Sequence, residues 1–383
     1  MKKYIYFICI ACFTIVLSAC GSQPAKQEDD LHARTENAGC QAQIPQQEND
    51  PLREIVDRMS LEEKAAQMFI ARCPEENAEE LAGQYKLGGY ILFARDFKDS
   101  TPDKVRKTIE SYQAQADIPM FIGVDEEGGT VNRVSRYTQF RNTPFPSPQA
   151  LYSRGDMEAV FMDAKEKSEF LLDLGINLNF APVCDVSQDS ADFIYDRTLG
   201  LGPEKTAEYV RNVVNAMDKA KIGCVLKHFP GYGNNVDTHT GIAHDNRQYQ
   251  QFLDCDFLPF MAGIEAGAGM VLVSHNIVAC MDREFPASLS VRVHEILRKD
   301  LGFQGVIITD NLAMDAIGQY IDDEDAAVLA IQAGNDMICC TNFTEQIPAV
   351  VQAVKDGKIE EGGLEEAVFR ILKLKRKLGI IKE

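Results

Sequence analysis

Eight short apolar runs, each followed by a helix-length amphipathic segment or a long loop, constrain the fold of this chain more than any other feature. The runs lie at residues 67–71, 89–93, 120–124, 176–183, 224–226, 270–273, 306–308 and 337–340. Helices are expected between several of them, at residues 156–174, 203–220, 254–266, 291–301, 323–333 and 344–356, with a terminal helix near 364–378. This alternation predicts an α/β fold, a closed (β/α)8 TIM barrel in a single domain. An open doubly wound sheet is the alternative.

Polar residues follow these runs at the places where strands would end. They are Arg72, Arg95, Asp125, Asp185, the pair Lys227 and His228, His275, Asp310 and Asn342. The carboxyl ends of barrel strands face one common mouth, where the active sites of such barrels lie. We therefore expect a polar pocket that holds a hydroxyl-rich ligand by many hydrogen bonds.

The segment 227–241 concentrates chemistry-bearing residues, because three of the chain's six histidines lie between residues 227 and 244. Three glycines and Pro230 exclude a regular helix or strand across the segment, so it should be irregular and exposed. Lys227 and His228 at its start, with Asp237 and His239 further on, form a site hypothesis. The alternative is a polar surface turn.

The N-terminus has the pattern of a targeting segment. Lys2 and Lys3 precede an apolar run at residues 4–17, which is too short for a comfortable membrane span. The sequence Leu-Ser-Ala-Cys that ends at Cys20 resembles a bacterial lipobox. Residues 1–20 are thus expected to be a lipoprotein signal peptide, with Cys20 acylated and the protein lipid-anchored to the cell membrane outside the cytoplasm. The alternative is an ordinary secretory signal.

Residues 21–50 are polar and should form a disordered tether, which leaves residues 51–383 for the barrel. A Ser60-Leu-Glu-Glu63 capping box should begin a helix before the first apolar run. The net charge of −19 argues against a nucleic-acid partner, because such binding needs clustered Lys and Arg.

Cysteine usage does not indicate a disulfide framework. Of eleven cysteines, the signal would contain two and lipidation would use a third, so eight would remain. Several lie in or beside apolar runs at irregular spacing, and we expect them to be buried free thiols: Cys184, Cys224, Cys280, Cys339 and Cys340. No spacing among the cysteines suits a zinc site.

Six motifs in order carry a family resemblance that covers nearly everything from Pro51 onward. They lie at residues 59–68, 123–133, 179–186, 196–197, 227–239 and 309–314. With these motifs the chain resembles the glycoside hydrolase family 3 β-N-acetylhexosaminidases. The resemblance implies a hydrolase that works through two catalytic groups, a carboxylate and an acid/base.

The resemblance assigns Asp310 as the nucleophile and His239 as the general acid/base, with Asp237 hydrogen-bonding the histidine ring. The alternatives are a structural carboxylate at a strand end and a solvated loop histidine. Two motifs depart from the family pattern. Asn311 follows the nucleophile where the family usually has Asp or Ala, and Tyr232 replaces the usual histidine between two glycines.

Five further positions match family residues that hold the hydroxyl and acetamido groups of the sugar: Asp125, Arg133, Arg197, Lys227 and His228. Arg133 and Arg197 could instead form scaffold ion pairs. His275 is a weaker candidate for the site, and Met314 is expected to pack near the nucleophile.

The resemblance thus implies a retaining β-N-acetylhexosaminidase that releases terminal β-linked N-acetylglucosamine from peptidoglycan fragments or chitooligosaccharides. It should use no metal and no organic cofactor, and we expect a monomer. Two alternatives stay open. One is a sugar-binding lipoprotein without catalysis, and the other is an enzyme of the same fold that uses phosphate as the acceptor.

Overall fold

The computed structural model describes residues 50–235, 243–314, 317, 321 and 323–382. The expected signal peptide with Cys20, residues 21–49 of the tether, and both Asp237 and His239 lie outside these residues. Among the helices of the described ranges, none combines the length and the apolar character needed to cross a membrane.

The core of the structure is a closed barrel of eight strands, in which all neighbouring strands run parallel. The strands are β1 (Phe69–Arg72), β2 (Gly89–Leu92), β3 (Phe121–Val124), β4 (Leu178–Asn179), β5 (Gly223–Phe229), β7 (Met270–Val273), β9 (Val306–Asn311) and β10 (Met337–Cys340). They pair in chain order, and β1 closes the barrel on β10. Each expected apolar run overlaps one of these strands, so the barrel prediction is confirmed and the open sheet is wrong.

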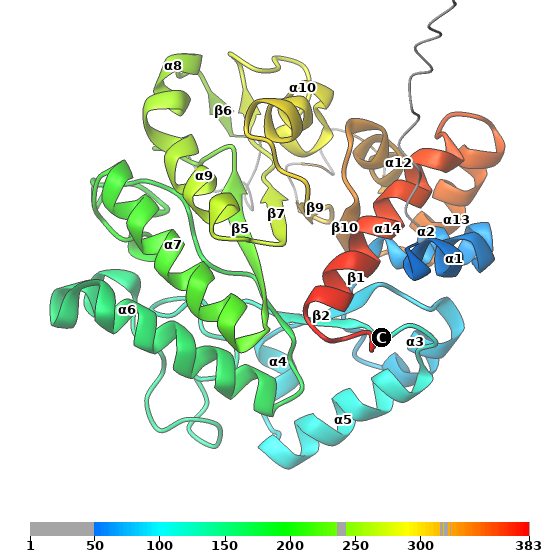
Figure 1. Cartoon of the computed structure of the whole chain (residues 1–383), viewed down its shortest axis with the longest axis horizontal. Helices are drawn as coiled ribbons and strands as arrows, with labels where there is room; N and C mark the ends of the chain where they lie inside the picture. The colour runs from blue at the N-terminus through cyan, green and yellow to red at the C-terminus, as the bar shows by residue number, and fades with distance from the viewer. Residues whose placement is uncertain (1–49, 236–242, 315–316, 318–320, 322, 383) are drawn as a thin grey trace, which may run out of the picture. The chain divides into compact units, whose positions relative to one another are not determined.

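Helices cover the outside of the barrel (Figure 1). They are α1 (Pro51–Arg58), α2 (Leu61–Gln67), α3 (Ala78–Tyr85), α4 (Ala94–Phe97), α5 (Pro102–Gln115), α6 (Pro148–Asp173), α7 (Pro203–Ala220), α8 (Tyr249–Gln251), α9 (Phe257–Glu265), α10 (Val291–Glu295), α12 (Asp323–Ala333), α13 (Phe343–Lys355) and α14 (Glu361–Lys377). Helix α14 packs against α1 and α2, so the described N-terminal and C-terminal segments lie side by side.

Local signals explain where several of these helices begin. The expected capping box is present before α2, because the Ser60 hydroxyl accepts from the Glu63 N–H and the Glu63 carboxylate accepts from the Ser60 N–H. Helices α5 and α6 begin in a related way, with a proline after a capping hydroxyl from Thr101 or Ser147.

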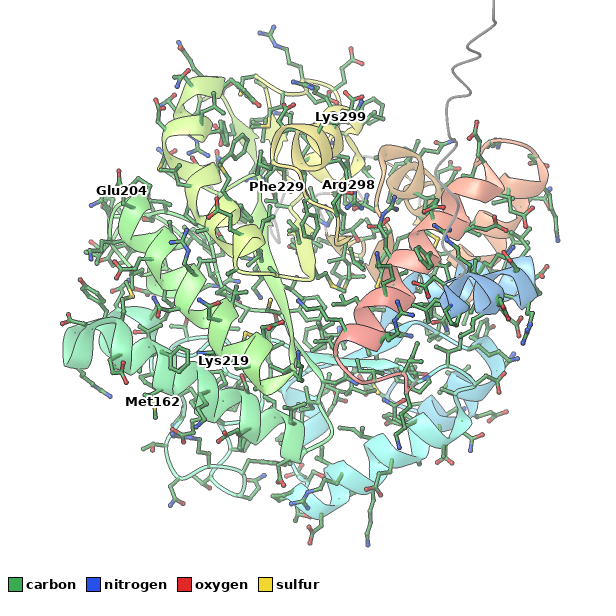
Figure 2. All side chains as sticks on the ribbon, in the orientation of Figure 1. Met162, Glu204, Lys219, Phe229, Arg298 and Lys299 are labelled. Carbon is green, nitrogen blue, oxygen red and sulfur yellow. The ribbon has the colours of Figure 1, made fainter. Side chains whose placement is uncertain are left out.

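Strand β5 corrects the expectation for the segment 227–241. The strand continues through Lys227 and His228 to Phe229, and all seven of its residues are buried. The next residues, 230–233, are buried as well. Figure 2 shows Phe229 within the fold, where its ring stacks on that of Phe257 in α9, whereas Met162 lies on the outer side of α6. The start of the expected exposed loop is therefore part of the core.

A small second sheet was not expected. It consists of β6 (His244–Asp245) and β8 (Ile277–Val278), which pair in parallel outside the barrel. Two of the predicted helices, 254–266 and 291–301, are each partly π-helical. The π-helical segments are Phe252–Asp256, which precedes α9, and Ile296–Asp300, which follows α10.

The cysteine prediction is confirmed with one correction. The seven cysteines that the structure describes are free thiols. Four of the five named cysteines are buried, but Cys280 is exposed. Cys280 follows β8 in the second sheet, which the apolar pattern did not reveal.

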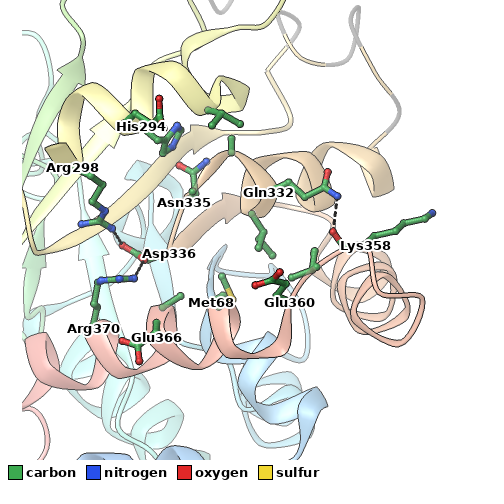
Figure 3. Close-up of a pocket in the computed structure, with 18 of the residues that line it drawn as sticks. Met68, His294, Arg298, Gln332, Asn335, Asp336, Lys358, Glu360, Glu366 and Arg370 are labelled. Atoms are coloured by element: carbon green, nitrogen blue, oxygen red, sulfur yellow. Dashed lines mark hydrogen bonds and ion pairs between the residues drawn. The ribbon is translucent and has the colours of Figure 1, made fainter. Parts of the chain in front are cut away.

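A cavity of about 700 Å³ lies between α10, α12 and α14 (Figure 3). Asp336 lies at its edge and binds both Arg298 and Arg370. Asp336 immediately precedes β10, so this cavity is at the amino ends of the strands. Active sites of parallel barrels lie at the opposite end, where the strands have their carboxyl ends.

Candidate active site

A cavity of about 450 Å³ lies at the carboxyl ends of the barrel strands. Six of the sequence-predicted site residues line it together: Asp125, Arg133, Arg197, Lys227, His228 and Asp310. They come from sequence positions up to 185 residues apart, and the barrel brings them into one pocket because its strands end on the same side.

Lys227 is held between two acids at the floor of this cavity. Its Nζ lies 2.6 Å from Oδ1 of Asp125 and 2.6 Å from Oε1 of Glu127. Burial by itself would lower the pKa of Lys227, but the two carboxylates raise it above its ordinary value. The ammonium group therefore stays charged, and the two carboxylates fix its position.

Arg197 makes a two-pronged ion pair with Glu127. Its Nε donates to Oε2 at 3.0 Å and its Nη2 donates to Oε1 at 2.8 Å. Burial would raise the pKa of Glu127, but the charges of Arg197 and Lys227 hold it well below its usual range. Arg197 thus forms a scaffold ion pair, which was the alternative to a binding role, and it lines the cavity as well.

His228 lies between an acceptor and a donor. Its Nδ1 is 2.7 Å from Oδ2 of Asp185, and its Nε2 is 3.1 Å from Nη2 of Arg197. Because a guanidinium group can only donate, Nε2 accepts and the ring proton is assigned to Nδ1. The imidazole is thereby fixed in one tautomer and one orientation.

Asp185 supports this arrangement from behind the cavity. It is fully buried and accepts three hydrogen bonds, from the backbone N–H and Nδ1 of His228 and from the backbone N–H of Tyr232. The sequence marked Asp185 as a strand end and Glu127 as part of a motif, but did not assign either to the site. The available signals were the position of Glu127 three residues after β3 and that of Asp185 after the apolar run that contains β4.

Asp310 is half-buried near the end of β9, and its Oδ1 accepts from the Asn311 N–H at 2.8 Å. His275 stabilises this strand end, because its Nε2 bonds to the Asn311 carbonyl at 3.0 Å and its Nδ1 to Ser288 at 2.7 Å. The buried His275 is therefore a supporting residue rather than part of the cavity wall. Met314 is also buried, and its N–H donates to the same carbonyl.

The positive charge of Arg133 is less closely paired with carboxylates than the charges of Lys227 and Arg197 are. Among the described residues Arg133 pairs with Asp125, at 3.9 Å, and its guanidinium lies 5.8 Å from the centre of the Phe93 ring. Arg72 contacts the same ring at 4.8 Å. The Arg133 side chain is 28% exposed, so its charge is available to a ligand in the cavity.

The expectation that all eight strand ends converge was too broad. Arg95 bonds to Glu75 and the Cys73 carbonyl, and Asn342 donates to Glu345 at the start of α13. Arg95 lies in α4 and Asn342 immediately precedes α13, and neither residue lines the cavity. The two remaining predicted residues, Asp237 and His239, lie outside the described part of the chain.

The described residues contain no group of three or more His, Cys, Asp or Glu side chains arranged to hold a metal ion. The cavity is lined by a half-buried carboxylate, Asp310, together with cations and hydrogen-bonding groups. Such a site can hold a polyhydroxylated ligand while a carboxylate oxygen attacks one of its carbons.

Comparison with known proteins agrees with this geometry. The model of the glycosyl hydrolase family 3 N terminal domain matches residues 60–374. Beta-hexosaminidase A of Pseudoalteromonas piscicida is 30% identical over 328 residues, which are 78% of this chain but only 55% of that protein. A beta-hexosaminidase of Xanthomonas campestris pv. campestris (strain B100) is 36% identical over 236 residues, covering 60% of this chain and 70% of that protein.

Solved structures show the same similarity. The family 3 β-N-acetylglucosaminidase of Paenibacillus sp. str. FPU-7 superposes with a TM-score of 0.78 at 29% identity, covering 85% of this chain and 64% of that one. The β-N-acetylhexosaminidase of Beutenbergia cavernae DSM 12333 gives a TM-score of 0.75 at 26% identity, covering 83% of this chain and 99% of that one.

Proposed function

Since the chain belongs to glycosyl hydrolase family 3, we propose that it is a retaining β-N-acetylhexosaminidase that releases terminal β-linked N-acetylglucosamine. One observation carries the proposal. Six residues that the sequence indicated separately, among them Asp310 and Lys227, line one cavity at the mouth of the barrel.

Asp310 is the proposed nucleophile. In the first step its carboxylate oxygen bonds to the anomeric carbon, while the bond to the leaving oxygen breaks and His239 gives that oxygen a proton. In the second step water attacks the same carbon, His239 takes the water proton, and the Asp310 carboxylate is released. Asp237 is proposed to hydrogen-bond the His239 ring and favour its protonated form.

The sugar is proposed to bind through Lys227, Arg197, Arg133, Asp125 and His228. A hydrogen bond to a charged group contributes ~1.5–3 kcal/mol. The ion pairs of Glu127 and the hydrogen bonds of Asp185 support this role, because they hold the binding groups in place before the sugar arrives.

Peptidoglycan fragments are the proposed source of substrate, with chitooligosaccharides as the second. The lipobox at Cys20 supports this order, because a lipid-anchored enzyme outside the cytoplasm would meet cell-wall fragments there.

The test is hydrolysis of a chromogenic β-N-acetylglucosaminide by the purified protein. Wild type should release the chromophore, and Asp310→Ala should lose nearly all of this activity because no nucleophile remains. Asn342→Ala, at a strand end outside the cavity, is the matched control and should retain activity. If wild type binds the sugar but turns over no faster than Asp310→Ala, the protein is a sugar-binding protein instead.

A further inference from the structure

Arg247, two residues after β6, binds three partners from different parts of the chain. Its Nε and Nη2 donate to Asp245, its Nη1 lies 2.9 Å from Oδ2 of Asp256, and its Nη2 donates to the Gly231 carbonyl at 3.2 Å. The Asp245 and Asp256 side chains are each only 1% exposed. We call Arg247, Asp245 and Asp256 the arginine clamp.

The two glycines after β5 allow the chain to lie directly on this clamp. Gly231 has φ +124°, and a Cβ there would be 2.2 Å from Oδ1 of Asp256. Gly233 has φ +54°, and a Cβ there would be 2.5 Å from Cζ of Arg247. Both positions therefore require glycine, for the backbone conformation and for the close approach.

The clamp also joins the described residues on either side of segment 236–242. Asn235, immediately before the segment, donates from Nδ2 to Oδ2 of Asp245 at 2.8 Å and to the Tyr232 carbonyl at 2.8 Å. On the other side, β6 pairs with β8, and the Ala243 carbonyl accepts from the Ile277 N–H at 2.8 Å. One carboxylate thus connects the two flanks, and the second sheet attaches it to the scaffold.

A second set of contacts leads from the clamp to the cavity. Arg247 holds the Gly231 carbonyl, and the next residue, Tyr232, donates its N–H to Asp185 at 2.7 Å. Asp185 in turn orients His228 in the cavity wall. The same arginine therefore restrains the chain on the cavity side and on the side of segment 236–242.

We propose that Arg247 is a positioning residue that, with Asp245 and Asp256, holds the described residues on both sides of segment 236–242 and thereby supports the acid/base step assigned to His239. This inference rests on the proposed function, in which His239 is the acid/base. A planar guanidinium can reach the three acceptors at once, which a lysine ammonium on a flexible stem cannot do with the same geometry. A displacement of about 1 Å at a reacting group can cost about 10²-fold in rate.

Arg247→Lys tests the proposal, and Arg298→Lys is its matched control. The Arg298 side chain is likewise 19% exposed and binds an aspartate, Asp336, and the carbonyls of Phe303 and Gly305. It lies at the opposite end of the barrel, by the cavity in Figure 3. Both substitutions replace a half-buried guanidinium by an ammonium, and only one of them alters the flanks of segment 236–242.

The readout is the ratio of kcat/KM on an aryl N-acetylglucosaminide to kcat/KM on the N-acetylglucosamine disaccharide. An aryl leaving group needs little protonation, whereas a sugar alcohol needs much, so a displaced acid lowers the second rate more. Arg247→Lys should raise the ratio about tenfold, and azide should restore part of its turnover because that anion needs no base. Arg298→Lys should leave the ratio at the wild-type value.

His239→Ala, measured in parallel, distinguishes failure of the positioning role from failure of the proposed function. If it raises the ratio but folded Arg247→Lys does not, the positioning role is wrong and the proposed function stands. If His239→Ala leaves the ratio unchanged, the acid/base assignment fails and the positioning role fails with it. Should Arg247→Lys not fold, Asn235→Ala removes only the link between the flanks, and an unchanged ratio in that variant overturns the proposal.

Discussion

The Nζ of Lys227 lies 2.6 Å from Oε1 of Glu127, although each side chain is only 3% exposed. A buried ion pair of this kind contributes little net stability compared with apolar packing, but removal of one partner leaves the other charge buried without compensation. Glu127 neutralises two cations of the site, Lys227 and Arg197, so it couples the stability of the barrel to the geometry of the cavity.

Glu127→Gln should therefore destabilise the protein strongly. We expect the free energy of unfolding to fall by about 3–5 kcal/mol in urea denaturation, because Lys227 and Arg197 lose a shared carboxylate. Glu361→Gln is the control, since it removes one of two partners of Lys64 and its side chain is 55% exposed. Similar losses of unfolding free energy in the two variants would show that the buried ion pairs of Glu127 contribute no more to stability than an exposed ion pair does.

Asp185→Asn should lower activity through His228. An amide nitrogen in place of Oδ2 would face the backbone N–H and Nδ1 of His228 as a donor, and in place of Oδ1 it would face the Tyr232 N–H. In either orientation part of the support of His228 is lost. We expect kcat/KM to fall and the imidazole nitrogen signals of His228 to change in ¹⁵N NMR. Asp336→Asn, at the other end of the barrel, should change neither quantity. Unchanged kcat/KM together with unchanged His228 signals in Asp185→Asn would contradict the supporting role of Asp185.

His239→Ala should depend on the leaving group. A general acid contributes ~10²–10⁴-fold, so the loss on a disaccharide should exceed the loss in glycosylation rate on an aryl glycoside by a comparable factor. The glycosyl-enzyme should accumulate on the aryl substrate, because no base activates water, and azide should give a β-glycosyl adduct. Mass spectrometry of the protein and of the products checks both expectations. Equal losses on the two substrates, without an adduct, would leave His239 a binding or structural residue.

Lys375 should make stability depend on pH. Burial lowers the pKa of Lys375 to about 7, although its Nζ donates to Oε1 of Gln67 at 2.9 Å. An unfolded lysine titrates near about 10.4, so between these values the unfolded state binds more protons than the folded state. The free energy of unfolding should therefore rise as pH increases from about 7 to about 10.

Urea denaturation across this pH range checks the sign. Lys375→Met should remove the rise, whereas Lys373→Met, on the exposed side of the same helix, should keep it. Identical pH profiles in the two variants would exclude Lys375 as the cause.

Cys20→Ser should abolish acylation. In a lipoprotein of the kind that the sequence predicts, a thioether at Cys20 would hold the lipid. A serine cannot form that thioether, so the variant should remain unprocessed or be released from the membrane. Metabolic labelling with a fatty-acid probe, followed by membrane fractionation, checks this. Equal labelling of wild type and variant would remove Cys20 from the proposal.

The barrel could be predicted from the sequence because its determinants are local. A run such as 120–124 is apolar throughout, as a strand buried on both faces must be, and a polar residue such as Asp125 follows where the strand ends. The motifs then indicated Asp310, Arg197 and Lys227, and parallel strands brought them together.

The partners of these residues were decided only by tertiary structure. Asp185 and His228 are 43 positions apart, and Lys227 and Asp125 are 102 apart, so no local pattern connects them. The two-residue strands β6 and β8 are too short for any periodicity, and the arginine clamp depends on them. The sequence also did not reveal that residues 227–233 are buried, because their burial depends on packing against distant segments. A sequence pattern shows where a strand ends, whereas the packing of distant segments decides which charges meet there and are shielded from water.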